Sequence, residues 1–285
     1  MVQVEVVTKR CEPIGITTVG KDQIVTTEEI VIRIFCFVDD QLYDVPKVPQ
    51  AKLYPSEIVT VGILFALKGN HFRAFYRWLR RDFDPLFGGL PHRTTLLRQL
   101  REQQVHTDNF MAQPSVLNVA DNYPIELLFP IREGRSAAQV GKKGKDKGRW
   151  SIGLKLCWII NSHGQVCAWR WDTLNCPDNQ FLDLFADYAF QAIILADWGF
   201  RCAQGLPDNV KVCKKGTWND RMAIETTFSL LTVVAHAKKM YHRAEAYIGA
   251  HLAYTAAMFN TCLTLFHQLH PDESPFKLSI AEFSL

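Results

Sequence analysis

The sequence predicts an α/β protein in which a mixed five-stranded sheet is flanked by helices and preceded by a small all-helical domain. Three observations lead to this prediction. Residues 26–101 carry apolar side chains at helical spacing, between capping and stop signals. Residues 115–171 contain short apolar runs bounded by turn residues, a pattern typical of strands. Residues 180–268 then alternate helical and strand-like patterns, as α/β domains do.

The composition is that of an ordinary globular protein. Apolar residues make up 48% of the 285 residues and charged residues 21%, enough for a real core in one large or two modest domains. A net charge of +3 does not by itself indicate a nucleic-acid partner. Eight cysteines without a Cys-x-x-Cys pair argue against structural zinc and favour buried thiols in a reducing cytosol. We expect a cytoplasmic protein, because the sequence has neither an apolar run of about 18 residues nor a signal-peptide layout.

Residues 1–110 are predicted to form a helical region that binds DNA. A capping box at 26–29 starts a helix that ends near Pro46, and a second helix runs from Pro55 to Gly69. Both have apolar residues at helical spacing.

The third predicted helix, with Asn70 as its cap, has one apolar and one basic face. Such a helix is suited to lie against a phosphate backbone. A further basic helix covers residues 93–101, and several such helices could form a helix-turn-helix-like module. A solvated surface is an equally good interpretation of the basic face. Its arginines are Arg73, Arg77, Arg80 and Arg81.

A polar connector over residues 102–114 leads into a second region, residues 111–270, which contains a strongly basic run at 141–150. The run is too charged for a core and is predicted to be a loop. Lysine and arginine clusters are a common footprint of nucleic-acid binding, so the loop is a candidate clamp on DNA phosphates. A solubilising hairpin tip is the alternative. The basic residues are Lys142, Lys143, Lys145, Lys147 and Arg149.

The remaining strands and helices follow from periodicity and turn residues. The first strand is expected to end at Asp121, before a turn that contains Pro124. Helices are expected at 180–189 and from about residue 218 to 268, and residues 271–285 form a tail without an assigned role. The other strands are predicted at 150–160, 166–171, 192–197 and 209–213.

Three acids occupy positions suited to chemistry. Asp121 and Asp197 each close a strand-like segment, where open sheets place their ligands. Glu225 lies on a predicted helix, one turn after Arg221. Three converging carboxylates would repel one another unless cations lay between them, so the pattern indicates a divalent metal site. An ordinary Arg–Glu surface pair is the alternative for Glu225.

Five blocks of sequence, three of which contain these acids, resemble those of DDE-type insertion-sequence transposases. The resemblance covers about residues 115–260 and implies a ribonuclease-H-like fold for the second region. Order and spacing follow the family pattern, and the first connecting block is where the family usually carries a lysine, here Lys155. The acids lie in blocks 121–125, 195–200 and 221–228, and the connecting blocks are 153–156 and 174–179.

The resemblance also implies a mechanism and partners. Asp121, Asp197 and Glu225 would bind two Mg²⁺ or Mn²⁺ ions, with Asp121 between the two. The substrates would be transposon terminal inverted repeats and target DNA, bound by a homodimer in the bacterial nucleoid. Further DNA contacts are implied for Arg221 and Lys155, near the scissile phosphate, and for Trp198 or Trp218, stacked on a displaced base.

Three positions depart from the family pattern. Trp198, Trp218 and Thr232 stand where the family usually has a small or basic residue, a tyrosine and a lysine. Other interpretations remain open: a metal-dependent DNA nuclease on the same fold, a catalytically inactive DNA-binding derivative, or an unrelated α/β protein in which three acids align.

Overall fold

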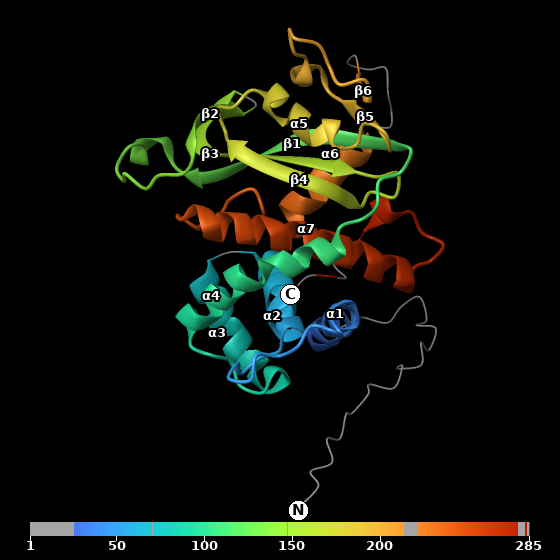
Figure 1. Ribbon diagram of the computed structural model, residues 1–285. Coiled ribbons are helices and arrows are strands. Elements are labelled where there is room, and N and C mark those ends of the chain that lie inside the picture. Colours follow the sequence, from blue (N-terminus) through green and yellow to red (C-terminus); the bar gives the residue numbers. More distant parts are fainter. Residues whose placement is uncertain (1–25, 70, 147, 214–221, 279–282, 284) are drawn as a thin grey trace, which may run out of the picture.

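A computed structural model describes residues 26–69, 71–146, 148–213, 222–278, 283 and 285. The chain is a mixed α/β protein. Figure 1 shows α7 (Glu245–Leu269) lying between a sheet and the N-terminal helices. The other α-helices are α1 (Thr27–Gln41), α2 (Pro55–Lys68), α3 (Phe72–Asp82), α4 (Arg93–Gln103), α5 (Leu182–Ala186) and α6 (Met222–Val233).

The sheet is mixed and has six strands, in the order β2-β3-β1-β5-β6, with β4 also paired to β3. The β1–β5 and β5–β6 pairs are parallel and the pairs that involve β3 are antiparallel. The strands are β1 (Leu117–Leu128), β2 (Lys142–Asp146), β3 (Arg149–Ile160), β4 (Val166–Thr173), β5 (Ile193–Ala196) and β6 (Val210–Val212).

The prediction of a loop at 141–150 was wrong, which is why the sheet has six strands and not five. Residues 142–146 form β2, which pairs with β3 in a hairpin. Gly144 is buried, and a Cβ atom there would lie 2.6 Å from Leu174 Cγ. The neighbouring lysines are exposed. Lysines are common on strands at a sheet edge, where they oppose pairing with another chain, so charge alone did not exclude a strand.

The prediction that β1 ends in a turn at Pro124 was also wrong. The strand continues to Leu128, and Pro124 pairs with Lys155 of β3. On its other side, β1 pairs with β5 only from Leu117 to Val119. Pro124 lies beyond this last pair, so its missing N–H is not needed by β5.

The start of α1 and both ends of α2 follow the predicted signals, whereas α1 ends at Gln41, before the stop predicted near Pro46, and α5 is shorter than the helix predicted at 180–189. Thr26 caps α1 by accepting a hydrogen bond from the Glu29 N–H (3.2 Å). Proline starts α2 at Pro55, and Gly69, with φ 65°, ends it. The expected cap Asn70 lies outside the described residues, and His71 is the N-cap of α3.

Residues 102–114 are more than the polar connector that the sequence predicted. Residues 104–110 form the 3₁₀ helix η2 (Gln104–Phe110), in which Phe110 is buried. The buried Asn260 of α7 donates to the Phe110 carbonyl and also bonds both the N–H and the carbonyl of Val166 (2.8 Å each). One α7 side chain therefore fastens η2 to the start of β4.

One continuous apolar cluster joins the N-terminal helices, α7 and one face of the sheet. Leu278 and Phe283, from the segment predicted to be a tail, are buried in it. A second cluster covers the other face, under α5 and the 3₁₀ helices η4 (Asp178–Phe181) and η5 (Trp198–Phe200). No helix in the described part of the chain is both long and apolar enough to span a membrane.

Helices α2 and α7 approach closely at Gly62, because a Cβ atom there would overlap the Tyr254 ring. Tyr254 is buried and donates to the Leu100 carbonyl (3.0 Å), so its ring is not free to move aside. We predict that Gly62→Ala lowers the free energy of unfolding by about 1–3 kcal/mol, the usual cost of overpacking. Urea denaturation measures this change.

Gly249→Ala, on α7, is the matched control. Its added Cβ would meet nothing nearer than Trp171 Nε1 at 3.9 Å. Stability should stay the same or rise by up to about 1 kcal/mol, because alanine favours the helix. Equal losses in the two variants would contradict the close packing of α2 on α7.

Candidate active site

The parallel register of β1 and β5 brings the first two predicted acids together. The paired residues are Leu117 with Ile193, Asn118 with Ile194, and Val119 with Leu195. Two residues beyond the last of these pairs stand Asp121 and Asp197. Because side chains alternate and adjacent strands lie about 4.8 Å apart, both carboxylates project from the same face on neighbouring strands. Both residues are half-buried.

Each of these two carboxylates accepts a hydrogen bond from a nearby backbone N–H. Asn122 N donates to Asp121 Oδ1, and Gly199 N donates to Asp197 Oδ1, both at 2.7 Å. Asp197 is the N-cap of η5. Local backbone therefore restrains both acids.

Helix α6 carries Glu225 over the same face of the sheet. The Phe228 ring lies 5.1 Å from the Tyr123 ring and 6.0 Å from that of Trp158, the β3 partner of Asp121. Further along, the hydroxyls of Thr232 and Tyr123 are 2.7 Å apart.

The chain after α6 continues in the direction of β1, because Glu126 N donates to the Lys238 carbonyl. Glu225, one turn before Phe228 and exposed to solvent, therefore lies toward the Asp121 end of β1. The three acids come from adjoining elements of one sheet face.

Within the described residues, no group of three or more histidine, cysteine, aspartate or glutamate side chains is arranged to hold a metal ion. The chemistry of the donors nevertheless fits Mg²⁺, which takes oxygen ligands. Asp121 and Asp197 offer carboxylate oxygens on the face of the sheet that α6 covers.

Asp178, which the sequence analysis did not single out, is a fourth acid beside this pair. Its Oδ1 accepts from Asn122 Nδ2 (2.9 Å) and from Lys155 Nζ (2.7 Å). A Cβ atom on Gly199 would overlap its Oδ2 and lie 3.0 Å from Asp197 Oδ1, so both carboxylates border the same glycine.

The pKa of the Cys157 thiol is affected by burial and by two of these acids. Burial raises its pKa well above the usual value, and the nearby carboxylates of Asp121 and Asp178 raise it further. The carboxylates of Asp121 and Asp178 therefore both lie near the buried thiol of Cys157.

Lys155 was predicted to lie near a scissile phosphate, and the structure pairs it with Asp178. Its Nζ also donates to the Cys176 carbonyl (2.5 Å), and only 16% of its side chain is exposed. The signal for this pair was present in the sequence: a lysine inside an apolar strand needs a partner, and Asp178 is the acid of the next block.

Trp198, the residue after Asp197, is 49% exposed. The Arg201 guanidinium lies 3.0 Å from the centroid of its ring. An exposed indole backed by a guanidinium is a surface on which a nucleic-acid base can stack. The sequence analysis missed Arg201, which lies just beyond the 195–200 block.

The basic β2–β3 hairpin is partly neutralised by nearby acids. Lys143 Nζ lies 3.8 Å from Glu133, and Arg149 lies 3.6 Å from Glu126. Lys142 and Lys145 are exposed, and no described residue forms an ion pair with either. The hairpin therefore presents positive charge to solvent.

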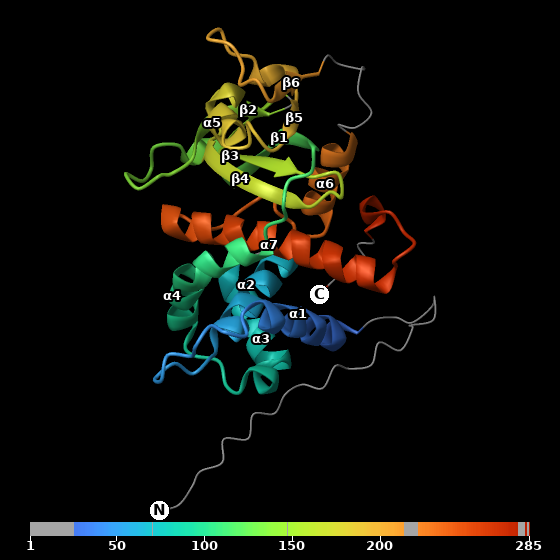
Figure 2. The same ribbon diagram turned by 45° about the vertical axis from the view of Figure 1, so that its right-hand side comes forward.

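The arginines predicted on α3 are exposed. Arg81 pairs with Asp82 (2.6 Å), whereas Arg73, Arg77 and Arg80 form no ion pair with any described residue. Figures 1 and 2 place α3 on the opposite side of α7 from the sheet. Three other predicted DNA contacts, Lys147, Trp218 and Arg221, lie outside the described residues.

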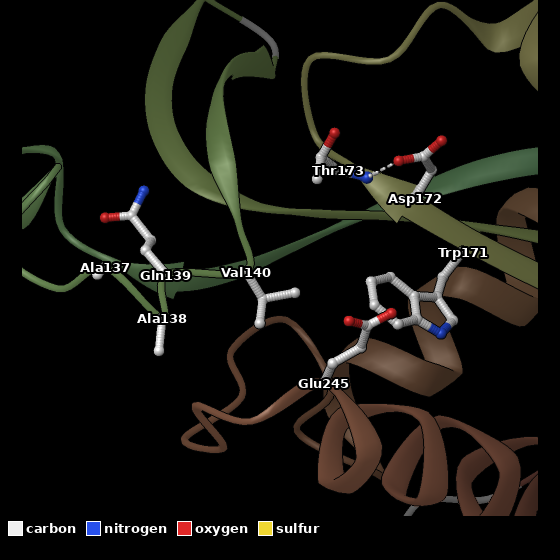
Figure 3. Close-up of a pocket in the computed structure, with 8 residues that line it drawn as sticks. All are labelled: Ala137, Ala138, Gln139, Val140, Trp171, Asp172, Thr173 and Glu245. Atoms are coloured by element: carbon white, nitrogen blue, oxygen red, sulfur yellow. Dashed lines mark hydrogen bonds between the residues drawn. The ribbon is translucent and has the colours of Figure 1, made fainter.

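A groove away from these acids is lined by residues 137–140, the end of β4 and Glu245. Figure 3 shows the Glu245 carboxylate beside the Trp171 ring, and the Asp172 carboxylate bonded to the Thr173 N–H (2.5 Å). None of the three predicted metal ligands lines it.

Comparison with known proteins adds no identification, since no protein-family model and no curated protein matches the chain.

The Tyr123–Thr232 hydrogen bond fastens α6 to β1 and so helps to place Glu225. Burial raises the pKa of Tyr123 to about 12, with the hydroxyl of Thr232 as its partner. We predict that Tyr123→Phe lowers the free energy of unfolding by about 1 kcal/mol, the usual net value of one hydrogen bond. Chemical denaturation measures it.

Tyr43→Phe, at a side chain that is 85% exposed, is the control and should leave stability unchanged. A double-mutant cycle with Thr232→Ala should show a coupling energy of similar size. Purely additive losses would mean that the two hydroxyls do not stabilise each other.

Proposed function

We propose that this protein is a DDE-type DNA transposase, which cleaves DNA strands and joins them to target DNA in a Mg²⁺-dependent reaction. The observation that supports this most is the parallel register of β1 and β5, which sets Asp121 and Asp197 each two residues beyond the last paired residues, on the face of the sheet that α6 and its Glu225 cover. The same three acids were selected from sequence blocks alone.

The sheet agrees with the ribonuclease-H-like core that the resemblance implies. Without the edge strand β2, five strands remain, in a mixed sheet with an antiparallel hairpin on one side of β1 and two parallel strands on the other. Helices cover both faces, as that core requires.

Asp121, Asp197 and Glu225 would hold the divalent ions. Such ions would polarise the scissile phosphate of the DNA and activate an oxygen nucleophile, water or a DNA 3′-hydroxyl. The protein's own contribution is positioning and charge. Backbone N–H groups restrain two of the carboxylates, and Trp198 with Arg201 offers a stacking surface beside them.

Two basic surfaces would bind the DNA. Lys142 and Lys145 lie on β2, a strand of the sheet, and the arginines of α3 lie on the other side of α7. Because α7 separates these surfaces, they would contact different segments of DNA. We propose that the DNA substrates are transposon terminal inverted repeats and target DNA. The protein would bind them as a homodimer in the bacterial nucleoid.

Removing one acid should separate catalysis from binding. We predict that Asp121→Asn or Glu225→Gln lowers Mg²⁺-dependent cleavage by about 100-fold or more, because charge stabilisation at phosphorus is lost. DNA affinity without metal should remain unchanged. Asp187→Asn, at an exposed acid away from the site, is the control. Cleavage is measured on DNA that carries the inverted repeats flanking the reading frame.

The outcomes separate the alternatives. Joined products support a transposase, whereas cleavage without joining indicates a nuclease on the same fold. If the unmodified protein binds DNA but cuts nothing with Mg²⁺ or Mn²⁺, it is a DNA-binding derivative. Normal cleavage by the Asp121→Asn variant would sink the assignment of the acids.

Neutralising α3 should weaken DNA binding without affecting the fold. For Arg73→Gln, Arg77→Gln and Arg80→Gln together, we predict a shallower salt dependence of binding, by about 0.9 logarithmic units for each phosphate that the variant no longer neutralises. Fluorescence anisotropy at several salt concentrations measures this slope. Arg81→Gln, at an arginine already paired with Asp82, is the control. An unchanged slope in the triple variant would make the basic face of α3 an ordinary solvated surface.

A further inference from the structure

Asp178 is connected to both sheet acids through the residues that hold them. Its carboxylate accepts from the side chain of Asn122, whose backbone N–H donates to Asp121. It also packs directly on Gly199, whose backbone N–H donates to Asp197. One carboxylate therefore contacts both residues whose N–H groups restrain the candidate metal ligands.

The chain brings Asp178 there from a separate element. Asp178 starts η4, which packs against η5 above the second apolar cluster. The side chains of Asn122 and Lys155 point to this face of the sheet, beside Cys157, whereas α6 lies on the opposite face. Asp178 and Glu225 therefore lie on opposite faces of the sheet.

Lys155 balances the charge of Asp178. The ammonium lies 2.7 Å from Oδ1, and the two side chains are only 16% and 30% exposed. A third carboxylate beside Asn122 and Gly199, if its charge were not compensated, would repel the carboxylates of Asp121 and Asp197. With Lys155 in place, Asp178 can hold Asn122 and Gly199 without adding net charge near the two acids.

We propose that Asp178, neutralised by Lys155, is a positioning residue that aligns Asp121 and Asp197 through Asn122 and Gly199. The proposal extends the proposed function, since it assumes that these acids bind the metal. Lys155 is then assigned to Asp178 and not to a DNA phosphate.

The test combines Asp178→Asn with Gly199→Ala. The first keeps the size of the side chain and removes its charge, and it is the decisive variant. The second keeps the charge but adds a Cβ that would overlap the Asp178 carboxylate, and this Cβ would also lie 3.0 Å from Asp197 Oδ1. Both should weaken Mn²⁺ binding, measured by calorimetry, by about 10- to 100-fold, the usual effect of losing a partner of a metal ligand. Melting curves check that each variant folds.

Asp172→Asn is the matched control. This acid lies directly opposite Lys155 on β4, so the same charge is removed nearby, but its carboxylate bonds the Thr173 N–H. The Mn²⁺ affinity of the Asp172→Asn variant should stay close to that of the unmodified protein. An equal loss in this variant would show that charge alone matters, and would overturn the positioning role.

Hydrogen exchange provides a readout that does not involve metal. In Asp178→Asn and Gly199→Ala, the backbone amide protons of residues 122 and 199 should exchange faster, because their carboxylate acceptors lose alignment. Unchanged protection in both variants would overturn the proposal. If the unmodified protein binds no Mn²⁺ while the two amides still respond to Asp178→Asn, the positioning role stands and the proposed function fails.

Discussion

The parallel pairing between β1 and β5 is the constraint on which the candidate site depends. It spans only three residue pairs, yet it decides which side chains of the two strands lie abreast. A slip of one residue would turn Asp197 to the opposite face from Asp121. The buried contacts of Val119, Ile194 and Leu195 oppose such a slip, because each would lose its place in the core.

The third acid depends on a different kind of contact. Glu225 is placed by α6, which is held on β1 by aromatic packing at Phe228 and by the Thr232 hydroxyl. Thr232 stands where the transposase family that the sequence resembles usually has a lysine, and its contact with Tyr123 gives that position a structural role here. Sheet register thus positions two acids, and packing of a helix positions the third.

Much of the fold was predictable because local signals agree with it. The caps at Thr26 and Pro55, the stop at Gly69 and the hairpin around 161–164 all fall where the sequence placed them. The misses share one cause. Residues 142–146, Pro124 and residues 104–110 all have unfavourable local character, and each is stabilised by a partner outside its own segment. Residues 142–146 pair with β3, the second strand of their hairpin, Pro124 pairs with Lys155 of β3, and residues 104–110 are bonded by α7.

The sequence by itself determined the α/β class and most element boundaries, and it predicted the three acids, because periodicity, capping residues and spacing are local properties of the chain. Only the tertiary structure decided that Asp121 and Asp197 share a register, that Lys155 serves Asp178, and that the basic surfaces lie on opposite sides of α7. The physical reason is that register, ion pairing and layer order arise from contacts between segments far apart in the chain, which no local pattern encodes.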